Sequence, residues 1–156
     1  VDPSISGDLL GYAGPVALRD DSHLPYEAEM STTAAVLSRL AASTAVDFIL
    51  HETLHAMGIG TLWQSKDLLN SSGNYIGTHG LNALRAMANN PYITSVPVDG
   101  TSGHFAENIF GNEVMTPLLG KSSAFSPLSV AALADLGYAV DFSQAEQYVL
   151  PVGVVV

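Results

Sequence analysis

The sequence predicts an α+β fold, because two capped helical segments, short strand-like stretches near the N-terminus and long irregular connections occur in one chain. Of its 156 residues, 47% are hydrophobic and 13% are charged, so the chain can bury a core and is not an acidic disordered segment. No repeat or linker divides it. We expect one domain over residues 1–156, with an N-terminal part (1–58) and a C-terminal part (59–156).

The N-terminal stretch, residues 1–30, predicts one or two short strands. Gly and Pro residues mark turns there, and residues 16–18 and 26–30 have the composition of short strands. The next segment, residues 31–40, is rich in Ala and Leu, so it fits either a helix or an extended connector.

A helix is predicted over residues 45–57. Thr44 can cap its N-terminus, Asp47 completes a capping-box pattern, and Gly58 is a plausible stop. An apolar stripe at helical spacing predicts burial of one face. Its members are Val46, Leu50, Leu54 and Met57.

The C-terminal part predicts two helices separated by long irregular segments. Residues 59–79 read as loop, residues 81–88 as a short helix, and residues 92–125 as an irregular stretch of a length that is usually functional. The last helix is the best delimited: Ser126 caps it, Pro127 takes its first position and Gly137 ends it. Residues 151–156 would form a fraying end or a docked strand.

Composition excludes several classes of function. The chain has 5 Lys and Arg against 15 Asp and Glu, a net charge of −10 without any basic cluster, which disfavours nucleic acid and anionic membranes as partners. With 0 Cys, it has no disulfide, thiolate metal site or Cys nucleophile. Its apolar runs fall far short of the roughly 20 residues of a transmembrane helix.

The candidate chemistry begins at His51-Glu52-Thr53-Leu54-His55, an H-E-x-x-H motif inside the predicted helix. His51 and His55 are four residues apart and share one helical face, so both can bind one metal ion, with Glu52 beside its open side. Imidazole nitrogens suit Zn²⁺, which keeps a position for water when it has three protein ligands. From the His and Glu content, chance would give roughly 0.006 such motifs in a chain of this size.

The third ligand is not fixed by local spacing. No Glu lies between Glu52 and Glu107, which disfavours a downstream glutamate ligand, and the run at 77–81 that could carry an aspartate ligand has Leu81 instead. The remaining nitrogen donors are His23, His79 and His104.

The extended metzincin motif H-E-x-x-H-x-x-G-x-x-H is matched through Gly58, but Thr61 occupies the position of its third His. The leishmanolysin family keeps this Gly and inserts a long segment before its third His and the following Met-turn. The present sequence resembles that arrangement, with Gly-His-Phe at 103–105 and Asn-Glu-Val-Met-Thr-Pro at 112–117. Residues 59–63 and 132–138 are also similar to bacterial members, and the resemblance runs from about Gly7 to Asp141.

The resemblance implies a metzincin-like catalytic domain: a small mixed sheet packed on the active-site helix, then a loop-rich part with the Met-turn and a final helix. It makes His104 the third Zn²⁺ ligand and Met115 the Met-turn methionine. His79, in a Gly-flanked turn, is then a solvated or loop-stapling residue, and His23 is a solvated loop residue. Metzincins usually place several strands and a long helix before the active helix, so we expect upstream elements to be missing or replaced by smaller ones.

The activity implied is that of a zinc metalloendopeptidase acting on a peptide or protein substrate. Zinc would activate a water and polarise the peptide carbonyl, with Glu52 as general base. Substrate would lie along an edge strand within residues 26–31, which includes Glu29 and Met30. Thr116 and Pro117 would wall the pocket, and Pro117 replaces the Tyr with which some metzincins stabilise the oxyanion.

Two other functions stay open. One is a zinc-stabilised binding or adhesion module with the same fold and little turnover, against which Glu52 argues, because a structural site needs no base. The other is a latent enzyme inhibited by a pro-segment. By resemblance, an extracellular or cell-envelope location is expected.

Overall fold

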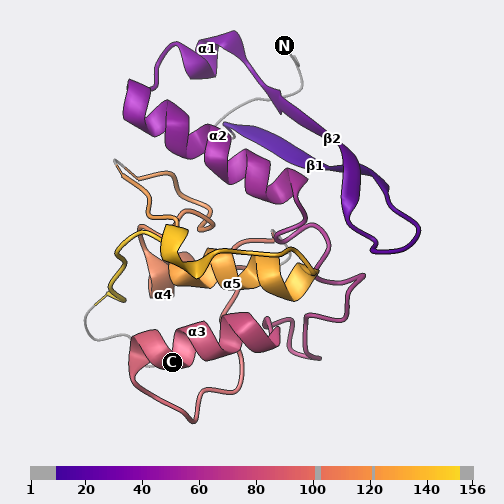
Figure 1. Ribbon diagram of the computed structural model, residues 1–156. Coiled ribbons are helices and arrows are strands. Elements are labelled where there is room, and N and C mark those ends of the chain that lie inside the picture. The colour runs from indigo at the N-terminus through magenta and orange to yellow at the C-terminus, as the bar shows by residue number, and fades with distance from the viewer. Residues whose placement is uncertain (1–9, 101–102, 121, 152–156) are drawn as a thin grey trace.

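The computed structural model describes residues 10–100, 103–120 and 122–151, and in these ranges the fold is α+β (Figure 1). A two-stranded sheet is combined with five α-helices and one 3₁₀ helix in the described ranges. In chain order the elements are β1 (Gly11–Leu18), β2 (Pro25–Thr32), α1 (Ala34–Leu37), α2 (Ala42–Ala56), α3 (Thr78–Ala88), α4 (Glu107–Phe110), α5 (Pro127–Leu136) and η1 (Phe142–Gln144).

The sheet is a hairpin. Strands β1 and β2 pair antiparallel, with Tyr12 opposite Ser31 and register irregularities near Ala17. The two short strands expected before residue 31 are therefore present, but the sheet is antiparallel in the described residues rather than mixed. In the ambiguous segment after them, the structure has the four-residue helix α1, where the Thr33 hydroxyl accepts a hydrogen bond from the Val36 amide at 3.1 Å.

Helix α2 carries the H-E-x-x-H motif and begins earlier than predicted, at Ala42. Thr44 lies in its first turn and is not the cap; Ala41 takes the cap position without a side-chain hydrogen bond, and Ala42, a good helix former, is the first helical residue. The expected stripe is also wrong at Val46, which is 67% exposed, because β1 covers another face of the helix and buries Phe48.

The C-terminal end of α2 confirms the predicted stop. Gly58 has φ +114°, its amide donates to the His55 carbonyl, and the Ile59 amide donates to the Leu54 carbonyl. This pair of bonds is a Schellman motif, which turns the chain sharply after the motif helix.

Helix α3 starts three residues before its predicted start because its first turn is capped by a distant residue. Asp135 of α5 accepts hydrogen bonds from the His79 and Gly80 amides, each at 2.8 Å. Helix α5 itself has its predicted bounds: the Ser126 hydroxyl accepts from the Leu128 amide, and Gly137 ends the helix with φ +109°.

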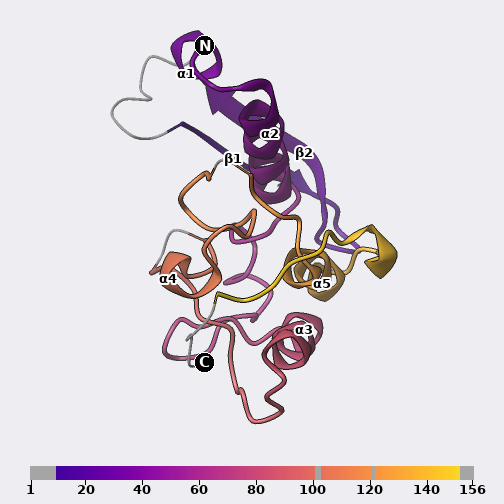
Figure 2. The ribbon, with the colours of Figure 1, turned by 90° about the vertical axis from the view of Figure 1, so that its left-hand side faces the viewer.

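Helix α5 lies between α2 and α3, and the view from the side shows the same order (Figure 2). The main core surrounds α5 and lies almost entirely in the C-terminal part. Its aromatic centre consists of Trp63, Tyr75, Phe105 and Phe110, whose rings pack in successive contacts. None of the helices described is long and apolar enough to cross a membrane. Beyond Pro151, the predicted C-terminal end lies outside the described residues.

Candidate metal centre

The motif helix presents its two histidines to one point. The Nε2 atoms of His51 and His55 are 3.1 Å apart, and both side chains are buried. Each Nδ1 lies against a backbone carbonyl, at 2.6 Å from Val114 O for His51 and 2.9 Å from Ile59 O for His55. Because a carbonyl can only accept, each Nδ1 carries the proton and each Nε2 keeps its lone pair for a metal ion.

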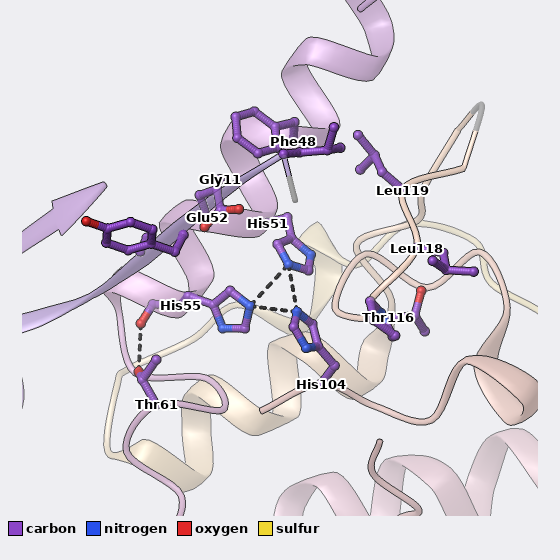
Figure 3. A pocket seen from close by; sticks show the side chains of 14 residues that line it. Gly11, Phe48, His51, Glu52, His55, Thr61, His104, Thr116, Leu118 and Leu119 are labelled. Carbon is purple, nitrogen blue, oxygen red and sulfur yellow. Dashed lines mark hydrogen bonds between the residues drawn. The ribbon is translucent and has the colours of Figure 1, made fainter. Parts of the chain in front are cut away.

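His104 completes the group from the other part of the chain. Its Nε2 is 3.0 Å from the Nε2 of both His51 and His55, as the dashed triangle in Figure 3 shows. His23, in the turn between β1 and β2, and His79, in the first turn of α3, are not part of the cluster. The structure thus brings His104 next to the two motif histidines across a long segment of chain. That segment starts at Thr61, where the extended metzincin motif would have its third histidine.

Two glycines bring His104 to the site by a close backbone crossing. A Cβ on Gly60 would lie 1.9 Å from Gly103 O, and both glycines have φ +76°. Only glycine fits such an approach, so the chain leaves the site at residue 60 and returns to it at residue 103. Thr61 stays beside the cluster, but its hydroxyl donates to the His55 carbonyl at 2.8 Å.

The three histidines fit a metal ion. Burial lowers the pKa of His51 and lowers that of His55 to about 4, so both imidazoles are neutral near pH 7. Unprotonated Nε2 atoms at 3.0–3.1 Å repel each other unless a cation lies among them. Tetrahedral nitrogen ligands of zinc lie about 3.3 Å apart, close to this spacing. The cluster can therefore hold a metal ion.

Glu52 lies beside the cluster and is buried, with 4% of its surface exposed. Its Oε2 has no hydrogen-bond partner, and burial raises the pKa of this carboxyl to about 7. A carboxylate kept in a cavity without a partner has an unused acceptor, which is what a proton-accepting group requires.

A cavity of about 710 Å³ opens over the histidines and Glu52 (Figure 3). One side is formed by Leu10 and the first three residues of β1, and the other is the segment 116–119, which includes the predicted wall residues Thr116 and Pro117. Phe48, Leu118 and Leu119 make the cavity largely apolar away from the histidines. It is a pocket with convergent polar groups at one end, the usual form of a ligand site.

The strand at the cavity is β1, whereas the family resemblance predicts the substrate strand within residues 26–31. Glu29 and Met30 belong to β2, pair with Gly14 and Ala13, and do not line the cavity. The hairpin puts the earlier strand next to the cavity, and nothing in the local sequence indicates which strand takes that place. Gly11 has a role there that sequence reasoning missed: a Cβ would lie 2.7 Å from the Phe48 ring.

Met115 is fully buried in the segment that supports the histidines. Its carbonyl accepts from the Phe105 amide at 2.9 Å, next to His104, and the neighbouring Val114 carbonyl accepts from His51.

Comparison with protein-family models and with curated proteins gives no match. Function therefore has to be argued from the site.

Proposed function

We propose that this chain is a zinc-dependent endopeptidase of the leishmanolysin-like metzincin type. The observation that carries the proposal is the triangle of three Nε2 atoms from His51, His55 and His104, with the buried Glu52 beside it in an open cavity. Three histidines are one of the ligand sets of catalytic zinc sites, and a structural site would not need the adjacent carboxylate. An extracellular or cell-envelope location belongs to the same proposal and rests on the resemblance.

Zinc, when bound, would supply a Lewis acid for the peptide carbonyl and would lower the pKa of a water toward about 7. Glu52 takes the proton from the attacking water and passes it to the nitrogen of the leaving amine. Burial alone raises its pKa to about 7, and the charge of a bound zinc ion would act in the opposite direction, favouring the ionised form that accepts the proton.

Peptide binding is assigned to the edge of β1 that borders the cavity. A peptide adding there as a third strand would run antiparallel to residues 11–13 and place its scissile bond beside the histidines. The apolar wall formed by Phe48, Leu118 and Leu119 would accept an apolar side chain next to that bond.

The test compares zinc content and cleavage of a fluorogenic peptide library for the wild type and Glu52→Gln. We expect the variant to keep one zinc per chain and to lose about 10²- to 10⁴-fold in kcat/KM, since it lacks the base. Glu27→Gln, an exposed residue of β2, is the control and should cleave like the wild type.

A wild type that carries no zinc after dialysis, or a Glu52→Gln variant that cleaves at the wild-type rate, contradicts the proposal. Stoichiometric zinc with a large loss of stability in chelator and no cleavage of any peptide would instead support the alternative, a zinc-stabilised binding module.

A further inference from the structure

Glu113 is a buried carboxylate that the proposed mechanism does not use. It is 1% exposed and lies in the irregular segment between α4 and α5. Three groups donate hydrogen bonds to it: the Met115 amide at 2.5 Å, the Ser126 hydroxyl at 2.7 Å and the Ser129 hydroxyl at 2.5 Å. The side chain therefore ties its own segment to the first turn of α5.

The backbone that Glu113 holds is in contact with both parts of the metal centre. The Val114 carbonyl accepts from His51 Nδ1 at 2.6 Å. The Met115 carbonyl accepts from the amide of Phe105, the residue after His104, at 2.9 Å. Two successive carbonyls thus support one ligand on α2 and the loop that carries another.

Val114 and Met115 themselves belong to no helix or strand. In this segment the Val114 amide donates to Ala124 O, and the Ala124 amide donates to Asn112 O. These bonds join two loop segments to each other. The Glu113 bonds anchor the pair to α5, and the Ser123 amide, which donates to Asp47 at 2.9 Å, anchors it to α2. Since burying a carboxylate is costly, an apolar side chain would serve better if the position needed only packing.

We propose that Glu113 is a positioning residue of the metal centre, which fixes the Val114 and Met115 carbonyls and through them the orientation of His51 and the His104 loop. Residues that orient metal ligands through hydrogen bonds keep those ligands in the geometry that binds the metal, and their loss typically weakens metal binding. The inference rests on the metal-binding half of the proposed function and is independent of peptide hydrolysis.

The test measures metal affinity of Glu113→Gln. In the amide, an NH₂ group replaces one acceptor oxygen, so the hydrogen bonds to that atom are lost unless a serine hydroxyl turns to accept instead of donating. We expect the Kd for Zn²⁺, from competition with a chromophoric chelator, to rise about 10- to 100-fold. The visible spectrum of the Co²⁺-loaded protein should also change in band position or intensity.

Asp135→Asn is the matched control. Asp135 also accepts three hydrogen bonds, from the Tyr75 hydroxyl and from the His79 and Gly80 amides, and it also links α5 to another segment. That segment consists of Tyr75 and the start of α3, and neither lines the metal cavity. The control should lower the melting temperature of the apo-protein to a similar extent and leave the Zn²⁺ affinity within about threefold of the wild type.

Equal Zn²⁺ affinities and unchanged Co²⁺ spectra in both variants would overturn the inference, because a merely structural role shifts only the melting temperature. It is also overturned if the wild type binds neither ion. If Glu113→Gln does not fold, Ser129→Ala removes one donor, and an unchanged Kd in that variant then counts against the proposal. A wild type that binds zinc without cleaving peptides contradicts the endopeptidase proposal while leaving Glu113 as a positioning residue.

Discussion

The two parts of the chain are built differently. In the N-terminal part, β1, β2 and α2 are regular elements, yet β2 is mostly exposed and side chains such as Tyr26 (61%) and Val46 (67%) lie in solvent. In the C-terminal part, long irregular segments separate short helices, yet nearly all of the main core lies there. Regular secondary structure and burial are therefore concentrated in different regions of this molecule.

The difference shows which interactions order each part. The N-terminal part depends on backbone hydrogen bonds within a hairpin and a helix. The C-terminal part depends on aromatic packing and on two carboxylates that accept hydrogen bonds from distant segments. Glu113 accepts from the Ser126 and Ser129 hydroxyls, and Asp135 accepts from the His79 and Gly80 amides. The histidine cluster takes two ligands from the first part and one from the second, so a bound metal would join them.

The largest effect we expect is on the core of the C-terminal part. Phe110→Ala should lower the free energy of unfolding by about 3–5 kcal/mol, since Phe110 is fully buried and its ring packs on Phe105. Tyr26→Ala removes a ring of similar size from β2 and should stay within about 0.5 kcal/mol. Urea denaturation in the presence of a chelator measures both. If both variants lose a similar free energy of unfolding, the stabilising core is not concentrated in the C-terminal part.

The second effect is that of metal removal. Zinc at 100 times its Kd should stabilise the fold by about 2.7 kcal/mol, seen as a higher melting temperature that chelator reverses. His104→Ala should abolish this gain, whereas His79→Ala, an exposed histidine outside the cluster, should keep it. Trp63, the only tryptophan, contacts the ring of Phe105 next to His104, so its fluorescence is a convenient probe. A gain that survives His104→Ala would show that His104 does not bind the metal and does not link the parts.

The regular elements and the motif could be predicted because their signals are local. Ser126, Pro127 and Gly137 delimit α5, and the spacing of His51 and His55 on a helix places them on one face. Some predictions from local signals are wrong. Thr44 looks like a cap but lies inside α2, where Ala41 and Ala42 extend the helix.

What could not be predicted depends on contacts between distant segments. The start of α3 is set by Asp135, 56 residues after His79, and the arrival of His104 depends on the crossing of Gly60 and Gly103. Local spacing left His104 as one of three candidates, and only the resemblance favoured it. No local sequence pattern indicates the role of Glu113, because its partners Ser126 and Ser129 come next to it only when the chain folds back into α5.

The smallest effect we expect is a loss of stability at alkaline pH that originates in the C-terminal part. Tyr75 is fully buried, whereas Tyr12 and Tyr26 of the hairpin are 40% and 61% exposed. Burial, and then the nearby Asp135 carboxylate, raise the pKa of Tyr75 well above its usual value. A raised folded-state pKa means that stability is complete below about pH 10 and falls above it, because only the unfolded chain releases the proton. The slope for this one group is about 1.4 kcal/mol per pH unit.

Tyr75→Phe should reduce that slope, at a cost of about 1 kcal/mol at neutral pH from the lost hydrogen bond to Asp135. Urea midpoints between pH 9 and pH 11.5, with phenolate absorbance followed in parallel, measure both. Tyr92→Phe, which alters an 86% exposed ring, is the control and should leave the slope unchanged. Burial of Tyr148 also raises its pKa, so part of the alkaline slope remains in Tyr75→Phe. If Tyr75→Phe leaves the whole slope in place, the alkaline sensitivity does not come from the buried Tyr75 hydroxyl and its hydrogen bond to Asp135.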